Sequence, residues 1–248
     1  MTLADFFSEH PKAALAFSGG VDSAYLLYAA RALGADVRPY YVKTCFQPAF
    51  ELEDGEKLAR ILEIPMTVVE VDILGSDAIR KNPGNRCYYC KKAILKAIGE
   101  AAARDGYTTL LDGTNASDDV SDRPGFQALK ENGVLSPLRE AGLTKEKIRE
   151  LSRAAGLFTW DKPAYACLAT RIPTGVPIEK ADLAAIERGE EALKGLGFRD
   201  FRIRRLGKTA KIQVREEQLG LVLEKRPQIR EALREDFSDI LLDLEVRA

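Results

Sequence analysis

Short apolar segments alternate along the chain with longer segments of helical periodicity. The apolar runs predict strands at residues 13–17, 36–42, 66–71 and 109–112. Apolar positions at helical spacing predict helices at residues 21–33, 49–62, 91–104 and 145–155. Strands that are apolar throughout are typical of a parallel sheet covered on both faces. We therefore expect an α/β fold with a doubly wound parallel sheet, in which ligands bind at the carboxyl ends of the strands.

The pattern changes between residues 158 and 177, where Pro163, Pro173 and Pro177 interrupt a stretch of little periodicity. We place a linker here and predict two domains, residues 1–175 and residues 176–248. The second domain should contain helices at 180–196 and 217–235, the latter with an optional break at Pro227, and strands at 198–205, 208–215 and 240–246. This order predicts a small α+β domain.

Composition and charge narrow the class of protein. The chain is 46% hydrophobic and 30% charged, which argues against disorder and against a disulfide scaffold. Its 37 basic and 38 acidic residues leave a net charge of −1, so we expect no nucleic-acid partner. No apolar run is long enough to span a bilayer and no signal region opens the sequence, so we expect a cytoplasmic protein without a membrane partner. His10 is the single histidine, which argues against catalytic triads and His-zinc sites.

A glycine-rich turn, SGGVDS at residues 18–23, follows the first predicted strand. Gly19 and Gly20 let the backbone turn tightly at a helix start, where N–H groups and the helix dipole favour an anion. The hydroxyls of Ser18 and Ser23 can donate to phosphate oxygens, and Asp22 suits an anion site if Mg²⁺ bridges it to the phosphates. The alternative is a plain strand-to-helix turn in which Asp22 and Ser23 cap the helix. The turn is not a Walker A loop, because the Gly-Lys-Ser/Thr ending is missing.

Three of the four cysteines, Cys87, Cys90 and Cys167, allow a metal site. Cys87 and Cys90 form a C-x-x-C pair at a helix start beside basic residues, a setting that stabilises thiolates. Three thiolates could hold a [4Fe–4S] cluster and leave one iron open. A four-ligand zinc site recruiting Cys45, a redox dithiol, and cysteines without a metal are the alternatives.

The turn at residues 18–23 resembles the PP-loop of the ATP pyrophosphatase superfamily, whose members split ATP between its α and β phosphates. Further segments resemble the LarE family of ATP-dependent sulfur transferases over most of the chain. They are NRCYYCK at 85–91, DGTN at 112–115 with Asp118 and Asp119, RPG at 123–125, SPL at 136–138, KPA at 162–164 and CLATRIP at 167–173.

The resemblance implies a substrate and a mechanism. LarE-type enzymes thiolate pyridinium-3,5-biscarboxylic acid mononucleotide for the nickel-pincer nucleotide cofactor. ATP and Mg²⁺ would bind at Ser18–Ser23, with Gly113, Thr114 and Asn115 near the nucleotide. A substrate carboxylate would then form an acyl-adenylate, and sulfur would displace AMP. For Gly113 to Asn115 the alternative is an Asp-Gly turn with an Asn cap.

The family uses two sulfur sources. Members with one active-site cysteine, here matching Cys167, sacrifice its sulfur. Members that also have the C-x-x-C resemble cluster-dependent tRNA thiolases, in which an open iron carries the sulfide. Because this chain has all three thiols, we favour a [4Fe–4S] cluster on Cys87, Cys90 and Cys167, supplied by a sulfide or sulfur donor. Sacrifice of Cys167 is the alternative.

The second domain carries the predicted substrate contacts. Arg202 and Arg204 alternate with apolar residues and therefore share one strand face. They match the family's substrate-phosphate arginines, Arg171 is a further candidate, and guanidinium groups bind phosphate and carboxylate well. A solvated strand face is the alternative. Glu190, on the preceding predicted helix, is a further catalytic candidate, which would either order these arginines or act near the nucleotide, and Glu191 is equally close to the family pattern. The resemblance also implies a homo-oligomer, in the family a hexamer.

Three rival functions agree less well with the sequence. A tRNA-thiolating PP-loop enzyme would need an RNA-binding module, and a chain of net charge −1 shows no strongly basic domain of that kind. An ammonia-dependent adenylating amidotransferase has no use for the three cysteines. A degenerate nucleotide-binding module is disfavoured because Ser18, Asp22 and Ser23 are all present.

Overall fold

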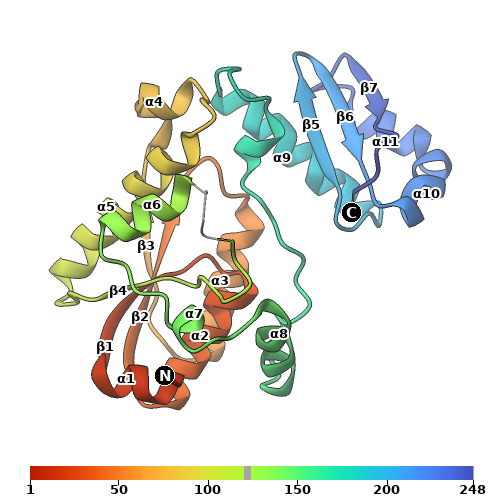
Figure 1. Ribbon diagram of the computed structural model, residues 1–248. Coiled ribbons are helices and arrows are strands. Elements are labelled where there is room, and N and C mark those ends of the chain that lie inside the picture. Colours follow the sequence, from red (N-terminus) through yellow and green to blue (C-terminus); the bar gives the residue numbers. More distant parts are fainter. Residues whose placement is uncertain (120–123, 248) are drawn as a thin grey trace. The chain divides into compact units, whose positions relative to one another are not determined.

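The computed structural model describes residues 1–119 and 124–247, which leaves Arg123 of the RPG segment outside the described residues. The chain divides into two compact units (Figure 1), one of residues 1–73 and 85–164, the other of residues 74–84 and 165–248. The first unit therefore ends at Ala164, before the predicted boundary at Gly175. Residues 74–84 join the second unit through backbone hydrogen bonds, from Gly175 to Asn82 and from Ile178 to Arg80, each 2.8 Å long.

The first unit alternates strands and helices as the apolar pattern predicts. Its elements are α1 (Leu3–Glu9), β1 (Lys12–Ala16), α2 (Val21–Ala32), β2 (Asp36–Lys43), α3 (Ala49–Ile61), β3 (Thr67–Glu70), α5 (Arg86–Arg104), β4 (Leu110–Leu111), α6 (Pro124–Glu131), α7 (Pro137–Glu140) and α8 (Lys145–Ala154). A 3-10 turn (η1, Ile73–Gly75) follows β3.

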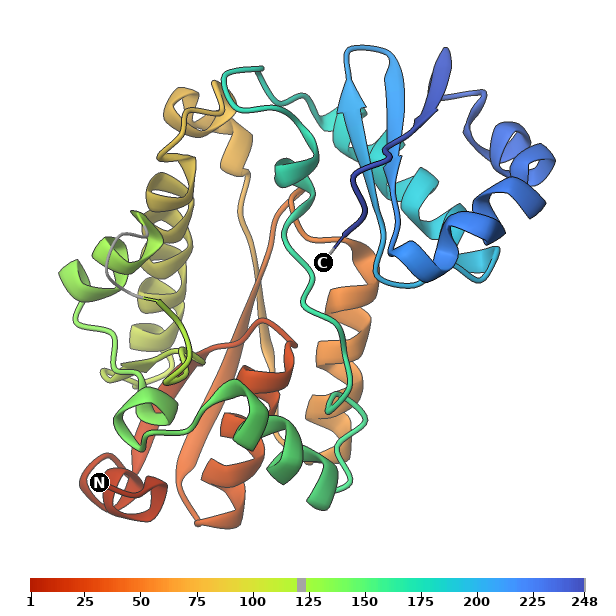
Figure 2. The ribbon, with the colours of Figure 1, turned by 45° about the vertical axis from the view of Figure 1, so that its right-hand side comes forward.

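The four strands form a parallel sheet in the order β3-β2-β1-β4 with helices on both faces (Figure 2). Neighbouring residues along a strand point to opposite faces. Leu15 and Tyr41 pack into the core on the side of α2 and α3. Ala14 and Tyr40 pack on the other side, with Ile98 of α5. The doubly wound α/β fold class is thereby confirmed.

The strand order places a topological switch beside β1. The chain proceeds from β1 to β2 and β3 on one side, and β4 then pairs with β1 on the other side. At such a point the loops after the two neighbouring strands diverge and leave room for a ligand. The loops concerned are Ser18–Gly20 after β1 and Asp112–Asn115 after β4.

The second unit has its own sheet and core. Its elements are α4 (Asp77–Arg80), η2 (Leu168–Arg171), α9 (Lys180–Gly195), β5 (Arg202–Leu206), β6 (Thr209–Gln213), η3 (Glu216–Gln218), α10 (Leu219–Glu224), α11 (Arg226–Leu233) and β7 (Asp239–Leu242). Strand β6 is antiparallel to β5 and parallel to β7. Helix α9 packs closely on the sheet, because a Cβ at Gly189 would lie 2.9 Å from side-chain atoms of Ile203 and Leu233.

Local backbone chemistry explains the break near Pro227, which the sequence allowed, and one difference from the predicted elements. The predicted helix at 217–235 is divided, and Pro227 lies in the first turn of α11, where its missing N–H costs nothing. The predicted strand at 198–205 begins only at Arg202, because Asp200 adopts a left-handed conformation with φ of 45°.

Candidate active site

The glycine turn after β1 is held in a conformation that requires glycine. Gly19 has φ of 71°, and a Cβ there would lie 3.1 Å from the carbonyl oxygen of Glu51. The hydroxyl oxygens of Ser18 and Ser23 are 3.1 Å apart, and Ser23 Oγ donates to Gly20 O at 3.2 Å. The N-cap residue of α2 is Gly20, which has no side chain to cap the helix. The start of α2 therefore keeps its N–H groups for an anion.

Asp22, in the first turn of α2, has two differently placed carboxylate oxygens. Oδ2 lies 2.6 Å from Nζ of Lys145, the first residue of α8. Oδ1 is buried and has no hydrogen-bond partner among the described residues. Burial raises the pKa of Asp22, Lys145 partly offsets this, and Asp118 adds to it. A carboxylate oxygen left without a donor beside a phosphate loop fits Mg²⁺, which prefers carboxylate and phosphate oxygens.

Two lysines supply the positive charge that the glycine turn itself lacks. Lys145 reaches Asp22, as described above, and Lys162 Nζ lies 2.7 Å from Asp54 Oδ2 and 3.4 Å from Gly19 O. Arg149 holds the segment before Lys162 by donating to Trp160 O at 2.7 Å and to Lys162 O at 2.8 Å. Sequence reasoning did not select Lys145, because nothing in the spacing signals which residues of α8 face α2.

The loop after β4 lies against the glycine turn. A Cβ at Gly113 would be only 3.0 Å from the backbone nitrogen of Ser23, so the two loops touch. Asp112 accepts hydrogen bonds from Thr114 Oγ1 and, at 2.7 Å, from Ser136 Oγ. Asn115 N donates to Asp118 Oδ2 at 2.9 Å. The structure thus brings the predicted nucleotide-binding residues of both loops together, within the first unit.

Cys87 lies in the first turn of α5 and Cys90 lies three positions later, and therefore on the same face of the helix. Cys87 is exposed and Cys90 is half-buried. Cys167 belongs to the second unit, immediately before η2, and is also half-buried. Among the residues that the structure describes, no three His, Cys, Asp or Glu side chains form a group that could hold a metal ion.

In the second unit, Glu190 of α9 joins the segment that carries Cys167. Its Oε1 accepts from Arg171 Nε at 2.9 Å and from Ile203 N at 3.0 Å. Its Oε2 accepts from Arg171 Nη2 at 3.1 Å and from the Tyr165 hydroxyl. Arg171, only 1% exposed, in turn donates to Ala166 O at 2.7 Å. Glu190 is buried whereas Glu191 is exposed, which favours Glu190 of the two candidates.

The predicted substrate arginines differ in what they contact. Arg204 donates to Thr170 O at 3.0 Å and to Gln213 Oε1. Arg202 is buried, donates to Phe201 O at 2.6 Å, and lies 3.8 Å from Asp200 Oδ1. Burial, followed by the charges of Arg171 and Arg247, lowers the pKa of Arg202 to about 10.

Further arginines, which sequence reasoning missed, share the carboxylate of Asp200. Arg215 Nη1 lies 3.0 Å from Asp200 Oδ2, and Arg247 Nη2 lies 3.0 Å from Oδ1. Arg202, Arg215 and Arg247 thus share Asp200, and Arg215 also pairs with Glu217 at 3.1 Å. The three guanidinium groups still outnumber these two carboxylates, which suits an anionic ligand.

Comparisons with known proteins agree with this arrangement. No protein-family model matches the chain. The chain is 36% identical over 221 residues to an uncharacterised protein of Synechocystis sp., covering 88% of this chain and 81% of that protein. It is 30% identical over 246 residues to pyridinium-3,5-bisthiocarboxylic acid mononucleotide synthase of Lactiplantibacillus plantarum, covering 98% of this chain and 89% of the synthase.

The chain belongs to the LarE family. A more distant relative, tRNA-specific 2-thiouridylase MnmA of Pseudothermotoga lettingae, is 25% identical over 188 residues, or 61% of this chain and 54% of the thiouridylase. The SGGVDS turn is therefore a PP-loop, and the LarE-family chain described here is an ATP-dependent sulfurtransferase.

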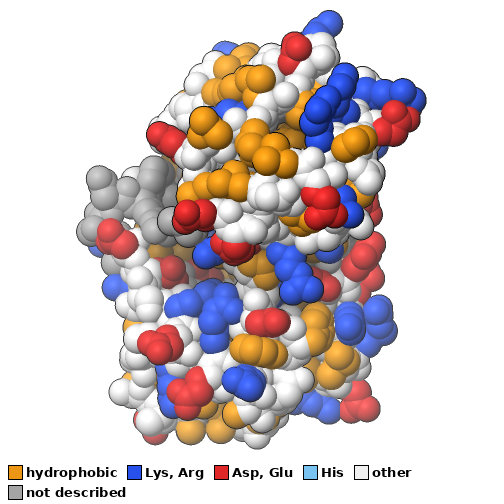
Figure 3. Space-filling view, turned by 90° about the vertical axis from the view of Figure 1, so that its right-hand side faces the viewer, with side chains coloured by type: hydrophobic (Ala, Val, Ile, Leu, Met, Phe, Trp, Pro, Cys, Tyr) orange, Lys and Arg blue, Asp and Glu red, His pale blue; other side chains and the backbone are white. Residues whose placement is uncertain are grey.

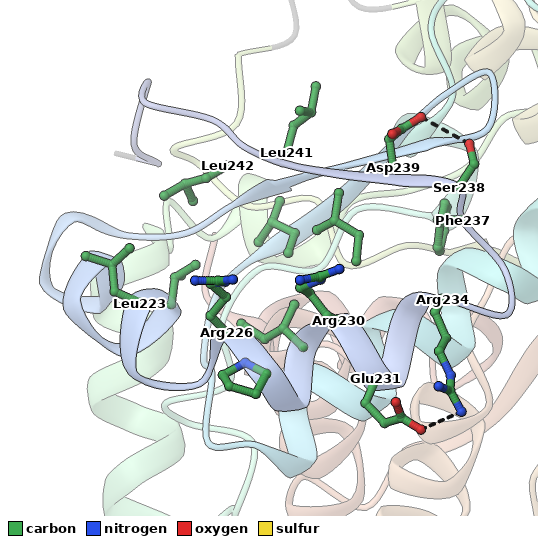
Figure 4. Close-up of a pocket in the computed structure, with 15 residues that line it drawn as sticks. Leu223, Arg226, Arg230, Glu231, Arg234, Phe237, Ser238, Asp239, Leu241 and Leu242 are labelled. Carbon is green, nitrogen blue, oxygen red and sulfur yellow. Dashed lines mark hydrogen bonds and ion pairs between the residues drawn. The ribbon is translucent and has the colours of Figure 1, made fainter.

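A cavity of about 750 Å³ in the second unit of this LarE-family chain lies apart from the predicted site residues. It is formed by α10, α11 and β7, and the side chains of Arg226 and Arg230 extend from α11 toward β7 (Figure 4). None of the predicted ATP, cysteine or substrate residues lines it. Within the described residues, no helix is both long enough and apolar enough to cross a membrane.

Proposed function

We propose that this chain inserts sulfur into pyridinium-3,5-biscarboxylic acid mononucleotide, by adenylation of a carboxylate and formation of a thiocarboxylate, in nickel-pincer nucleotide biosynthesis. The observation that carries the proposal is the 30% identity to a pyridinium-3,5-bisthiocarboxylic acid mononucleotide synthase over 98% of the chain. The PP-loop geometry supports it, because the chemistry begins with ATP.

ATP would bind at the switch point of the first unit. The N–H groups at the start of α2 and the hydroxyls of Ser18 and Ser23 would bind the phosphates, while Gly113 to Asn115 would lie along the nucleotide. Asp22 would hold Mg²⁺ through Oδ1, the oxygen without a donor. Bound there, Mg²⁺ would neutralise charge on the phosphates.

A substrate carboxylate then attacks the α-phosphorus of ATP. The bond to the bridging oxygen between the α and β phosphates breaks, and pyrophosphate leaves with that electron pair. The product is an acyl-adenylate, in which AMP is a much better leaving group than the original carboxylate oxygen. Sulfur attack on the carbonyl carbon then expels AMP and leaves the thiocarboxylate.

For the sulfur source we propose a [4Fe–4S] cluster held by Cys87, Cys90 and Cys167. The shared helix face of Cys87 and Cys90 supports the pair as ligands, and the start of α5 stabilises their thiolates. When bound, such a cluster would supply a labile sulfide. The second candidate is Cys167 itself, whose sulfur would add to the acyl-adenylate before its bond to Cβ breaks and leaves dehydroalanine.

For the substrate we propose contact with Arg202, whose carboxylate neighbour Asp200 is shared with Arg215 and Arg247. Arg171 and Arg204 contact the segment of residues 166–170 directly. That arrangement supports a role for them in holding the Cys167 loop in addition to any substrate contact. Glu190, whose two oxygens accept four hydrogen bonds, is suited to positioning Arg171.

We further propose a homo-oligomer, as the resemblance to the family implies. Large hydrophobic side chains are exposed on the second unit (Figure 3), among them Leu223, Leu241 and Leu244, which are 72%, 52% and 84% exposed. Apolar surface of this kind is commonly covered by another subunit. Light scattering after size-exclusion chromatography measures the mass directly.

The proposed function is tested by anaerobic incubation with ATP, Mg²⁺, sulfide and the biscarboxylic mononucleotide. We expect AMP and pyrophosphate in amounts that depend on the mononucleotide, and a mass gain corresponding to replacement of oxygen by sulfur. ADP and orthophosphate as products would contradict adenylation. A tRNA transcript replaces the mononucleotide in a parallel reaction, and sulfur incorporation only into the RNA would favour the tRNA-thiolase alternative.

A further inference from the structure

In the second unit the ring of Tyr165 packs against Arg171 and Arg202, although Tyr165 belongs to none of the sequence motifs. Its ring centroid is 4.6 Å from Cζ of Arg171 and 5.0 Å from Cζ of Arg202. Its hydroxyl donates to Glu190 Oε2. One side chain therefore contacts both guanidinium groups and the carboxylate that pairs with one of them.

The ring offsets the repulsion between the two arginines. Arg171 and Arg202 are both buried, and the charge of Arg171 disfavours the charged form of Arg202. The face of an aromatic ring carries negative charge density, and its attraction for a cation is strongest when the cation is desolvated by burial. Glu190 pairs with Arg171 and also favours the charged form of Arg202, and Asp200 Oδ1 lies 3.8 Å from Arg202. The ring adds to these carboxylates a contact with both guanidinium groups.

The hydroxyl fixes the ring in place. Burial, and then the charge of Glu190, raise the pKa of Tyr165, so the hydroxyl stays protonated and remains a donor. Glu190 is itself held by Arg171 and by the backbone N–H of Ile203 on β5. The orientation of the ring is therefore set by α9 and β5, two elements of the unit's core.

We propose that Tyr165 is a positioning residue that holds the guanidinium of Arg202 toward the anionic group of the substrate. This inference rests on the proposed function for the identity of the substrate. The contact between the Tyr165 ring and Arg202 does not depend on that function. Tyr165 acts through Arg202 and needs no contact with substrate. The hydroxyl and the ring make separate contributions, which two substitutions can distinguish.

The experiment compares Tyr165→Phe, which keeps the ring, with Tyr165→Leu, which removes it. Isothermal titration with the biscarboxylic mononucleotide should show binding weakened about tenfold in Tyr165→Leu and about threefold or less in Tyr165→Phe. Binding of ATP to the PP-loop should be unchanged in both. In an Arg202→Ala background, Tyr165→Leu should weaken mononucleotide binding by no more than a further factor of about two, because the guanidinium that Tyr165 positions is already absent.

The proposal would be overturned if Tyr165→Leu weakened mononucleotide binding equally in the wild-type and Arg202→Ala backgrounds. It would also be overturned if a folded Tyr165→Leu protein bound the mononucleotide as the wild type does. A second readout needs no substrate: the ring current of Tyr165 should shift the guanidinium NMR signal of Arg202, identified by its absence in Arg202→Lys. The shift should persist in Tyr165→Phe and disappear in Tyr165→Leu. If the wild type fails to bind the mononucleotide, the proposed function fails, while the NMR result still decides whether Tyr165 positions Arg202.

Discussion

At the scale of single residues, Asp22 and Lys145 form the contact most directly relevant to ATP. Lys145 occupies Oδ2 of Asp22 at 2.6 Å, and Oδ1 is buried without a donor among the described residues. A cation this close to the phosphate loop can exchange from the carboxylate to a phosphate when the nucleotide and its metal bind. We therefore expect Lys145 to contribute to ATP binding, which the SGGVDS sequence alone does not reveal.

Replacement of Lys145 by Met should raise KM for ATP about tenfold, because a charge-assisted contact worth about 1.5 kcal/mol is lost. Lys145→Arg keeps the charge and is the matched control. The measurement is mononucleotide-dependent pyrophosphate release. A Lys145→Met enzyme with the KM of the wild type would remove Lys145 from the phosphate site.

The same pair predicts a pH dependence. Mg²⁺ requires the ionised form of Asp22, and burial raises the pKa of this group above the ordinary aspartate value. Activity should therefore decline on the acid side at a higher pH than an ordinary aspartate would produce. Because Lys145 lowers the pKa of Asp22, Lys145→Met should move this acid limb to still higher pH. A pH profile of kcat/KM for Mg-ATP measures this acid limb. A shift of the limb to lower pH in Lys145→Met would contradict the proposal that Asp22 holds Mg²⁺.

Glu190 and Arg171 predict an effect on stability. The pair is buried, with side-chain exposures of 8% and 1%. Glu190→Gln would leave the guanidinium buried without its counter-charge, which costs about 3 kcal/mol or more. Chemical denaturation followed by tryptophan fluorescence and circular dichroism should show this loss. A Glu190→Gln protein of normal stability and no activity would instead support a direct catalytic role.

At the scale of elements, the contact between the loop after β4 and the start of α2 depends on Gly113. A Cβ at this position would lie 3.0 Å from Ser23 N and 3.2 Å from Ser23 Cα, both backbone atoms that cannot move without displacing the PP-loop. The switch point thus depends on close approach of two loops as well as on strand order.

Gly113→Ala should therefore raise KM for ATP about tenfold or more, since a small displacement of the phosphate loop disrupts several contacts at once. Gly99→Ala is the matched control, because Gly99 lies in α5 and a Cβ there has no atom within 4 Å. That control should leave KM unchanged and stabilise the helix by about 0.5–1 kcal/mol. Equal kinetic effects from the two substitutions would rule out the steric explanation.

At the scale of the whole molecule, the cysteines are divided between the two units, with Cys87 and Cys90 in the first and Cys167 in the second. Anaerobic reconstitution should bind about four irons per chain, with loss of iron on changing any one of the three cysteines to Ala. Cys45→Ala is the control and should keep the iron. Iron content and labile sulfide measure the outcome, and full activity of an iron-free protein would favour the sacrificial cysteine.

The sequence by itself determined the alternation of strands and helices in the first unit, because strands buried on both faces need apolar residues throughout. It also determined the PP-loop, since a left-handed residue such as Gly19 at a close backbone approach can only be glycine. The paired positions of Cys87 and Cys90 follow from helical spacing. These features depend on neighbours along the chain, which a linear pattern records.

Tertiary structure alone decided which distant residues meet at the sites. Lys145 reaches Asp22 because α8 packs on α2. Tyr165 reaches Arg202 of β5 because Glu190 of α9, which packs on β5, accepts a hydrogen bond from its hydroxyl. Residues 74–84 join the second unit through hydrogen bonds to residues far along the chain. Charged and aromatic side chains carry no periodic signal of their partners, so their contacts are determined only when the packed helices and sheets bring them within a few ångströms.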